Sequence, residues 1–408
     1  MNNYKYMDEI FLEEIRKMDS RNMKSTKKLI IESVNNGVIY PKSKKACGGV
    51  MDENSNFILL SKVDTFLKHD SFGGKTNNGQ IGNKYKDIKV IYFGNFWKQW
   101  GHFLIDSISR LWVFLENDDY KDYIICYTGH EIDGIYKEFL ELFGVDTNKL
   151  LHIEQAEKFK EILVPECSHM PGLYYTEEWK RIFDRVIARA LEKCEEMHIK
   201  KHSNKIIFSR RNFLKIGRAP FEVGESNIVK LFSKNGYEII CPEEYSLIEQ
   251  ISIINNSNEI VSISGTLAHT MVFAKDGTKL IQLKKYPEVN YRQIEINQCR
   301  NLDVYNLDVH ISPFVVRNGG PFVYDINKNI ITYFKDHNLK LENKEIIKGF
   351  ICRKVYMFYY FFVYFLFVRI IQRKESEPTL AFMKELNEGR RKIIRKKMKK
   401  YYLKKFFY

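Results

Sequence analysis

The chain has 408 residues, of which 44% are hydrophobic and 14% aromatic. This composition excludes an intrinsically disordered chain and leaves enough apolar material for two or three domains. Its seven cysteines are scattered, with no Cys-x-x-Cys pair, which argues against a disulfide framework or a structural metal and favours a reducing compartment. The first twenty residues lack the apolar core of a signal peptide, so we expect a cytoplasmic protein.

The formal net charge of +14 is concentrated at one end of the chain. Residues 350–408 contain sixteen Lys and Arg and four Glu, so the other 349 residues carry a net charge of only +2. A nearly neutral globular part does not suit the polyanionic surface of a nucleic acid. We therefore attribute the basicity to a tail. This tail carries no nucleic-acid-binding motif beyond its charge, so we expect no nucleic-acid partner.

Between residues 38 and 191 the pattern mixes strands and helices. Short apolar runs predict strands at 90–93, 123–126, 150–153 and 162–164, and helices are expected at 101–115, 135–143 and 177–198. Gly144 ends the second of these helices, and the third leads out of this first unit.

The segment Trp100–Trp112 (WGHFLIDSISRLW) places three ionisable side chains in an apolar helical pattern. His102, Asp106 and Arg110 recur every four residues, so each advances about 40° around a 3.6-residue helix. The pattern predicts an active-site helix with one buried face. The alternative is an ordinary amphipathic helix with a solvated His/Asp/Arg face. The expected buried stripe consists of Leu104, Ile108, Leu111 and Leu115.

Beyond residue 204 the alternation of strands and helices is more regular. Strands are expected at 205–209, 237–241, 259–263 and 279–283, the last closing the series, with helices at 226–234, 246–255 and 267–274. Such alternation predicts βαβ units and a parallel, Rossmann-like sheet. No G-x-G-x-x-G motif follows the first strand, so a dinucleotide cofactor is not indicated.

Two α/β units in tandem predict a cleft between them, and ligands collect at the carboxyl ends of parallel strands. Arg210 and Arg211 follow the strand at 205–209, where two guanidinium groups could bind a diphosphate through bidentate hydrogen bonds. The alternative is a solvated basic loop.

Three further candidates come from the helices and turns that follow. Gly265 and Thr266 form a strand-to-helix turn whose free backbone N–H groups suit a phosphate. His269, one turn later, could bind a ligand or simply pack in the core. Glu249 could accept hydrogen bonds from sugar hydroxyls or face the solvent. The chain has no Asp-x-Asp triplet to hold a divalent ion, so arginines and helix N-termini would have to supply positive potential.

Four blocks in this order resemble glycosyltransferase family 61, over roughly residues 85 to 285. The first, Gly101–Leu111, matches the family pattern GHFxxDxxxRL. The others are Ser209-Arg210-Arg211 with Glu225, then Pro242-Glu243 followed by Glu249-Gln250-Ile251, and Ser264–Phe273. Gly224 and Thr270 stand where the family commonly has Asn, and Ser264 where it commonly has His.

The resemblance implies a GT-B-like fold, in which two Rossmann-like domains face a cleft. It also implies an inverting, metal-independent transfer of a sugar from a nucleotide sugar, without a cofactor. Asp106 would be the general base, oriented by His102 or Arg110. His102 is the rival base, because imidazoles titrate nearer neutrality than carboxyls.

The resemblance assigns the nucleotide sugar to the second unit. The diphosphate would be held by Arg210, Arg211, Gly265 and Thr266, and the nucleotide or donor sugar would contact His269 and Glu249. We expect these residues to converge on one pocket with those of the first unit.

Val355–Val368 (VYMFYYFFVYFLFV) contains 14 consecutive apolar or aromatic residues, nine of them Phe or Tyr. It is shorter than the ~20 residues that a spanning helix needs. Because aromatic side chains prefer the bilayer interface and basic ones attract anionic lipid, we predict an in-plane membrane anchor. The alternative is that the run packs onto the globular part. The residues expected at the membrane are Phe358, Phe361, Phe362, Phe365, Arg369, Lys396 and Lys397.

We therefore expect three segments: an N-terminal α/β domain (1–198) with the acceptor side and catalytic helix, a Rossmann-like nucleotide-sugar domain (199–349), and an aromatic, basic tail (350–408). The function expected is that of a bacterial glycosyltransferase, peripheral on the inner face of the cytoplasmic membrane. It would act on a lipid-linked glycan in capsule or lipopolysaccharide biosynthesis. The alternatives are a polysaccharide-modifying transferase, such as a pyruvyl transferase, and a non-catalytic membrane scaffold with a transferase fold.

Overall fold

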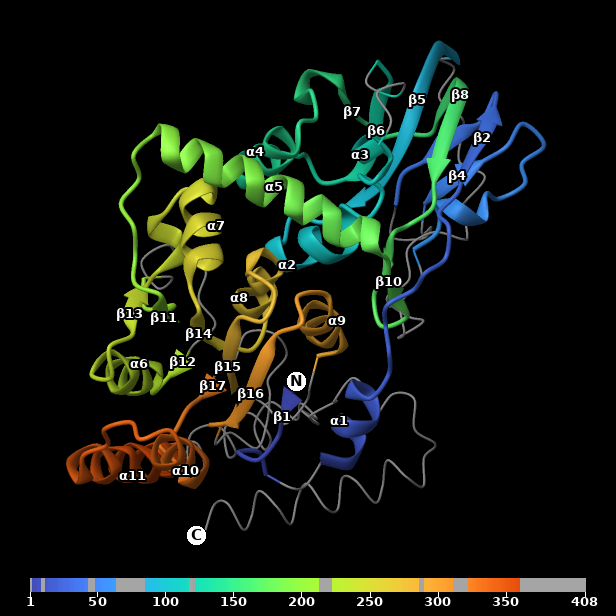
Figure 1. Cartoon of the computed structure of the whole chain (residues 1–408). Helices are drawn as coiled ribbons and strands as arrows, with labels where there is room; N and C mark the ends of the chain where they lie inside the picture. The colour runs from blue at the N-terminus through green and yellow to red at the C-terminus, as the bar shows by residue number, and fades with distance from the viewer. Residues whose placement is uncertain are drawn as a thin grey trace, which may run out of the picture.

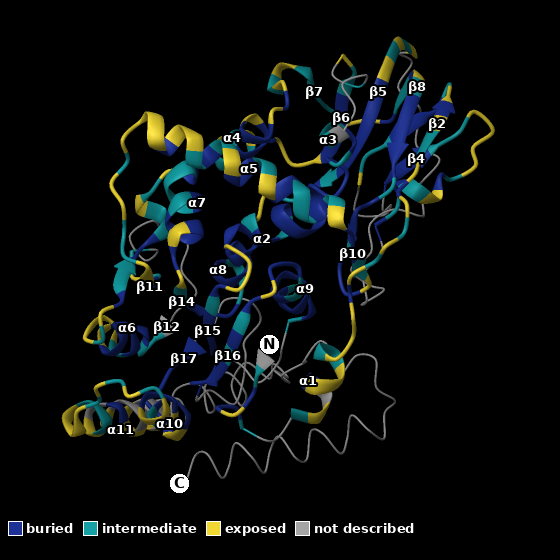
Figure 2. Ribbon diagram, viewed as in Figure 1, coloured by how far each residue is buried: buried dark blue, intermediate teal, exposed yellow. Residues whose placement is uncertain are grey.

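The computed structural model describes residues 2–8, 12–42, 48–63, 85–116, 120, 122–212, 222–285, 290–310 and 322–359. Within these residues the architecture is mixed α/β, with two sheets at opposite ends of the molecule (Figure 1). Helices α2, α8 and α9 lie in the middle of the view, and α5 runs from the upper left, above α7, to a point near β10 (Figure 1). Figure 2 shows that the strands and central helices are mostly buried, whereas α5 and α11 expose much of their surface.

The first sheet has seven described strands in the order β4-β3-β8-β5-β6-β7, with β2 also paired to β8. β5 runs parallel to β6 and β8, and β6 runs parallel to β7, whereas β2 and β3 are antiparallel to β8. The strands are β2 (Ile31–Asn35), β3 (Val38–Tyr40), β4 (Gly49–Met51), β5 (Tyr85–Phe96), β6 (Ile124–Gly129), β7 (Leu150–His152) and β8 (Glu157–Pro165).

The second sheet has six described strands, all parallel, in the order β1-β16-β15-β14-β11-β13. Its central strands β14 and β15 are buried at all but their first residue, as expected when helices cover both faces of a parallel sheet. The strands are β1 (Asn2–Asn3), β11 (Lys205–Phe208), β13 (Glu238–Ile240), β14 (Glu259–Ile263), β15 (Lys279–Lys284) and β16 (Asp303–Asp308). Two small ladders join β9 (His169–Met170) to β10 (Tyr174–Tyr175) and β12 (Glu222–Val223) to β17 (Phe322–Val323).

Four described helices, α4, α5, α6 and α7, begin and end within two residues of the bounds that the apolar periodicity predicts. α4 stops at Gly144, which takes φ of +101° as a left-handed cap. The helices are α1 (Leu12–Asp19), α2 (Trp100–His102), α3 (Val113–Glu116), α4 (Gly134–Phe143), α5 (Glu177–Glu196), α6 (Glu225–Ser233), α7 (Leu247–Asn256), α8 (Thr266–His269), α9 (Tyr291–Cys299), α10 (Lys328–Asp336) and α11 (Asn343–Tyr359).

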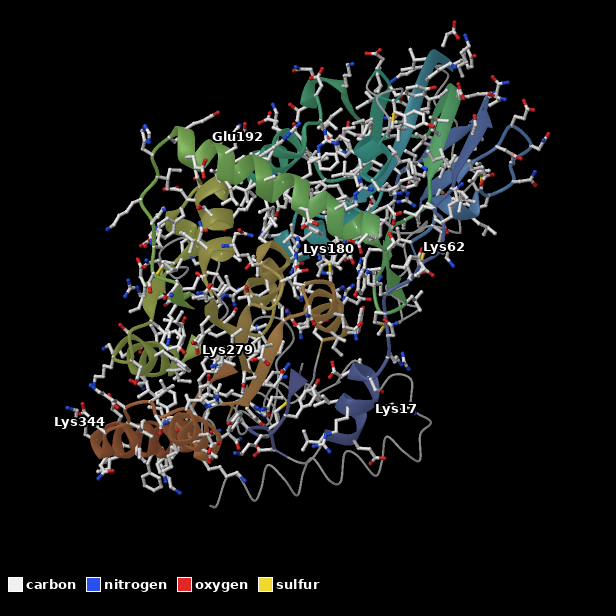
Figure 3. All side chains as sticks on the ribbon, viewed as in Figure 1. Lys17, Lys62, Lys180, Glu192, Lys279 and Lys344 are labelled. Carbon is white, nitrogen blue, oxygen red and sulfur yellow. The ribbon has the colours of Figure 1, made fainter. Side chains whose placement is uncertain are left out.

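Helix α5 joins the two halves. Its buried face packs against α4 of the first half and α7 of the second. Lys180 on this helix, labelled in Figure 3, pairs with Asp276 of the second half at 2.5 Å, and Asp184 pairs with Arg300 at 2.5 Å. The helix predicted to lead out of the first unit therefore also holds the second unit in place.

The predicted parallel, Rossmann-like sheet beyond residue 204 is confirmed, and so are the strands expected in the first half. Two expectations were wrong in detail. The strand at 279–283 is not the last, because α9 and β16 follow it and extend the sheet. Asn2–Asn3 pairs with β16, so the N-terminal residues lie with the second sheet and not with the first.

The end of the described chain bears on the predicted tail. α11 runs without interruption through residue 350, where the tail was expected to start. No helix among the described residues is long and apolar enough to cross a membrane. Of the expected membrane residues, Phe358 is described and 68% exposed. The remaining ones, Phe361, Phe362, Phe365, Arg369, Lys396 and Lys397, lie outside the described residues.

Candidate active site

The two halves of the molecule meet where α2 contacts α8. A Cβ atom on Gly101 would lie 2.9 Å from Nδ1 of His269 and 3.2 Å from Oγ1 of Thr266. Only a glycine allows this close approach without displacing a neighbour. The structure thus brings the first motif of the sequence, at Gly101 and His102, against the turn that carries Thr266 and His269.

The expected helix over 101–115 is not continuous. α2 ends at His102, a π-helical turn follows over Phe103–Ser107, and bends separate this turn from α3. Nearly all of this segment is buried, including Asp106 and Arg110. π-Helical turns inside helices are rare and occur often at functional sites. The prediction of a single polar face carrying His102, Asp106 and Arg110 was therefore wrong.

Arg110 lies in the interior of the first half, away from the contact between α2 and α8. Its Nε donates to the carbonyl of Pro165 at 2.9 Å, and its Nη2 donates to that of Leu60 at 2.7 Å. The guanidinium also packs closely on Gly94 and lies over the ring of Tyr92. These contacts tie β5, β8 and the short 3-10 helix Leu59–Ser61 together.

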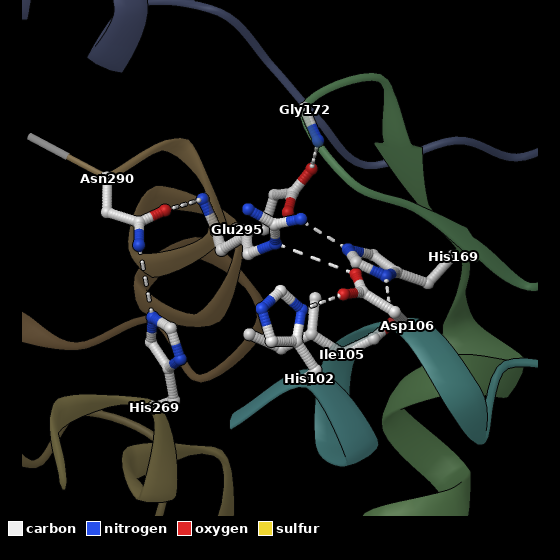
Figure 4. Close-up of polar contacts among 9 residues, drawn as sticks. His102, Ile105, Asp106, His169, Gly172, His269, Asn290 and Glu295 are labelled. Atoms are coloured by element: carbon white, nitrogen blue, oxygen red, sulfur yellow. Dashed lines mark hydrogen bonds and ion pairs between the residues drawn. The ribbon is translucent and has the colours of Figure 1, made fainter. Parts of the chain in front are cut away.

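Asp106 is the centre of a polar cluster that joins both halves (Figure 4). One carboxylate oxygen is hydrogen-bonded to Nδ1 of His102, and the other lies 3.5 Å from Nε of Arg292 on α9. The Asp106 side chain is only 2% exposed, whereas that of His102 is 32% exposed. Burial raises the pKa of Asp106, but Arg292, His102 and His169 more than offset this effect, so the pKa lies below its usual value.

Behind Asp106 lies a fully buried pair, His169 and Glu295 (Figure 4). Nδ1 of His169 donates to the carbonyl of Ile105 at 2.8 Å, and Nε2 lies 2.9 Å from the Glu295 carboxylate. The other carboxylate oxygen accepts the N–H of Gly172 at 2.5 Å. The His169 ring also stacks on Trp179 of α5 at a centroid distance of 4.4 Å. This pair holds the π-helical turn, through Ile105, against α9.

His269 is buried on the opposite side of His102 from this pair (Figure 4). The side-chain amide of Asn290 lies 3.4 Å from its Nε2, so that nitrogen acts as an acceptor. Asn290 also caps α9 by accepting the N–H of Arg292 at 2.9 Å. Burial, reinforced by the positive charge of Arg292, lowers the pKa of His269 to about 3, so the imidazole is neutral near pH 7.

Gly265 forms the strand-to-helix turn that was expected after β14. Its φ of +120° and ψ of −151° are accessible only to glycine. The Nζ atom of Lys285, which follows β15, lies 3.4 Å from the position of a Cβ atom there. A cationic side chain therefore lies beside the predicted phosphate turn.

The structure places Arg210 and Arg211 at the carboxyl end of β11. The backbone N–H of Arg210 donates to Glu225 at 2.6 Å, and Arg211 lies beside Cys241 at the end of β13. A narrow hollow at this edge is lined by Phe208, Glu225, Ile228, Val229, Ile263, Leu283 and Tyr324. Because β11 pairs in parallel with β14, which leads into the Gly265 turn, Arg210 and Arg211 lie at the same edge of the second sheet as that turn.

Glu249 has a local structural role. Its carboxylate accepts the backbone N–H of Ser246 at 2.8 Å and the Ser246 hydroxyl at 2.7 Å, which completes a capping box at the start of α7. These hydrogen bonds explain the presence of a glutamate at position 249 without a bound ligand.

Sequence reasoning missed His169, Asn290, Arg292 and Glu295. Each belongs to a segment without a recognised motif, and their roles depend on tertiary contacts. One signal was available: Arg292 and Glu295 are charged residues three apart in a helix whose other positions are mostly buried. Among the described residues, no three His, Cys, Asp or Glu side chains are placed to hold a metal ion.

Residues 100–281 match a protein-family model described as Glycosyltransferase 61. Among curated proteins, none matches the chain with significant sequence similarity. The matched region begins at α2 and ends within β15, so it contains His102, Asp106, Gly265 and His269 but stops before Arg292 on α9. The match supports the glycosyltransferase 61 family for this region and, with it, a transferase.

Proposed function

We propose that this protein is an inverting, metal-independent glycosyltransferase with a GT-B arrangement of its two halves. It moves a sugar from a nucleotide sugar to a glycan acceptor, which we propose to be lipid-linked and to belong to capsule or lipopolysaccharide biosynthesis. The observation that carries the proposal is the His102–Asp106–Arg292 cluster. It lies at the junction of the two halves, and its first two members fall within the region that matches the transferase family.

Inversion by direct displacement needs one base and fixed positive charge. The base takes the proton of the acceptor hydroxyl while the acceptor oxygen bonds to the anomeric carbon. The bond from that carbon to the phosphate oxygen breaks, and its electron pair leaves with the nucleoside diphosphate. Cations around the diphosphate stabilise the charge that develops there.

The geometry favours His102 over Asp106 as this base. The Asp106 carboxylate is buried, engaged at both oxygens, and held at a low pKa, so it is a poor proton acceptor. His102 is partly exposed, and its Nδ1 is bonded to Asp106. This bond leaves Nε2 to receive the acceptor proton, while Asp106 orients the ring and stabilises the imidazolium that forms.

Positive charge for the leaving diphosphate is available along the edge of the second sheet. Lys285 lies beside the Gly265 turn, and Arg210 and Arg211 follow the adjacent strand β11. We propose that these three side chains, with the backbone of Gly265 and Thr266, hold the diphosphate. The absence of an Asp-x-Asp triplet from the sequence supports a mechanism in which side-chain cations replace a metal ion.

Sugar transfer from a panel of nucleotide sugars to glycan acceptors, with and without a metal chelator, tests the function. We expect transfer that survives chelation and gives a product of inverted anomeric configuration by NMR. His102→Ala should lower kcat by about 10²- to 10⁴-fold. Asp106→Asn should be less severe, and Lys98→Ala, an exposed neighbour, should act as the control.

The results separate the two possible bases. Loss of activity in Asp106→Asn that exceeds the loss in His102→Ala would assign the base to Asp106. Retention of configuration, or the failure of every nucleotide sugar to support either transfer or hydrolysis, would overturn the proposed function.

A further inference from the structure

The C-terminal described helix, α11, packs on the second half through a small and polar inner face. Gly349 is buried, and a Cβ atom there would lie 3.2 Å from Cβ of Ile326 and 3.3 Å from an oxygen of Asp325. Glu345, one turn earlier, pairs with Lys234 of the α6 C-terminus. These contacts fix which side of α11 faces the protein.

The opposite side of α11 is apolar and exposed. Its large side chains are exposed by 48–68%, and we call this set the outer face: Ile347, Phe350, Ile351, Val355 and Phe358. On a 3.6-residue helix, Ile347, Ile351 and Phe358 all point within about 20° of the direction opposite to Gly349. A surface helix of a soluble protein normally shows the reverse pattern, with its apolar stripe turned inward.

Basic side chains border the outer face. Lys344, labelled in Figure 3, and Lys354 are both exposed. The Nζ atom of Lys354 lies over the Phe350 ring, 5.3 Å from its centroid. The sequence from Phe350 onward adds to this pattern, because residues 350–408 carry a net charge of +12 and continue the aromatic run that begins on α11.

We infer that the outer face of α11 docks on the surface of an anionic lipid bilayer, with the helix lying in the plane of the interface. From Ile347 to Phe358 the outer face is about 16 Å long, which suits an interfacial helix. Phe side chains insert at the level of the lipid headgroups, and each nearby Lys or Arg is attracted to anionic lipid. This inference concerns a surface apart from the His102 cluster and does not depend on the proposed activity.

Charge favours a bilayer over a second copy of the chain as the occupant of this face. An isologous dimer through the outer face would bring together the exposed Lys344 and Lys354 side chains of two copies. Like charges at short distance repel, whereas an anionic lipid surface complements them. The apolar side chains and the charge therefore point to the same partner.

Flotation with phosphatidylcholine vesicles, with and without phosphatidylglycerol, tests the inference on the full-length protein. We expect binding that requires the anionic lipid. The double variant Ile351→Ser/Phe358→Ser should weaken partitioning by about tenfold or more, because two large apolar side chains no longer leave water. Lys344→Glu/Lys354→Glu should weaken binding to the anionic vesicles by a smaller factor.

The matched control is Leu59→Ser/Met197→Ser, which replaces two apolar side chains that are 75% and 62% exposed elsewhere on the surface. It should bind vesicles like the wild type, and all variants should keep the wild-type unfolding midpoint because the positions are exposed. Unchanged binding of Ile351→Ser/Phe358→Ser would overturn the inference. So would a wild-type dimer in light scattering that this variant converts to a monomer. Transfer to a water-soluble acceptor should be unaffected, which keeps this test separate from that of the activity.

Discussion

Nε of Arg292 lies 3.5 Å from Oδ1 of Asp106, although the first residue belongs to a helix of the second half and the second to the π-helical turn of the first half. Both side chains are largely shielded from solvent, since Arg292 is 12% exposed and Asp106 is 2% exposed. An ion pair in such surroundings controls the charge of Asp106. Because Asp106 is also hydrogen-bonded to His102, Arg292 of the second half influences the electrostatic surroundings of His102 in the first half.

Replacing Arg292 tests this link. Arg292→Met removes the charge, so burial is opposed only by His102 and His169 and the pKa of Asp106 rises. The acid limb of the kcat/KM profile should move to higher pH, and kcat should fall by about 10- to 100-fold. Arg292→Lys keeps a positive charge and should restore part of the loss. A pH profile identical to that of the wild type would contradict the role of Arg292.

His269 should make stability depend on pH. Its pKa is about 3 in the folded protein and about 6.5 when unfolded, so the unfolded state binds the extra proton between these values. The free energy of unfolding is therefore not reduced by protonation of His269 above about pH 6.5. As the pH falls from there towards 3, the free energy of unfolding decreases by up to about 1.4 kcal/mol per pH unit.

Urea unfolding of the wild type and of His269→Gln near neutral and mildly acidic pH measures this effect. The variant should lose less free energy of unfolding on acidification than the wild type does. His198→Asn, at an exposed position, is the control and should keep the wild-type dependence. Equal acid sensitivity in His269→Gln and the wild type would show that His269 is not held neutral.

Glu295 should be a strong determinant of stability. Glu295→Ala leaves His169 and the N–H of Gly172 without their buried acceptor, which should lower the free energy of unfolding by about 3–5 kcal/mol. Glu295→Gln keeps an oxygen for Gly172 and should cost less. Glu192→Ala, on the exposed side of α5 (Figure 3), should change stability by less than about 0.5 kcal/mol. A similarly small effect of Glu295→Ala would mean that the buried pair does not hold α9.

Arg110 should matter for stability and not for catalysis. Arg110→Met leaves the carbonyls of Pro165 and Leu60 unpaired, each at a cost of about 1–3 kcal/mol. The activity per folded molecule should stay within about threefold of the wild type, because Arg110 lies outside the Asp106 cluster. A large loss of activity with unchanged stability would instead place Arg110 in the reaction.

The second half of the fold was predictable because each of its strands and helices carries its own local pattern. The strand Glu259–Ile263 has the predicted bounds, and the helix at 247–256 is set by the Ser246–Glu249 capping box. The break after His102 was not predictable, since Phe103–Ser107 reads as helix and its packing against β5 and His169 of β9 selects the π-helical turn. Asn2–Asn3 was missed because two residues carry no periodic pattern.

The site was only half predictable from sequence. His102, Asp106 and His269 stood out because each is an ionisable group in an apolar segment that begins at a glycine, either Gly101 or Gly265. Arg292 and Glu295 did not stand out, because their roles depend on contacts with Asp106 and His169, which are more than a hundred residues away in the sequence. Charged residues that pair only through the tertiary fold do not produce a recognisable spacing in the local sequence.

Helix α5 has a consequence for motion. It is packed on α4 and α7 at once and is pinned to the second half by Lys180 and Asp184, so the halves cannot separate along its length. The Asp106–Arg292 pair joins the same two halves, so a rotation of one half about α5 would stretch this pair. Such a rotation would move Arg292 away from Asp106 but would leave the hydrogen bond between His102 and Asp106 intact, because those two residues belong to the same segment.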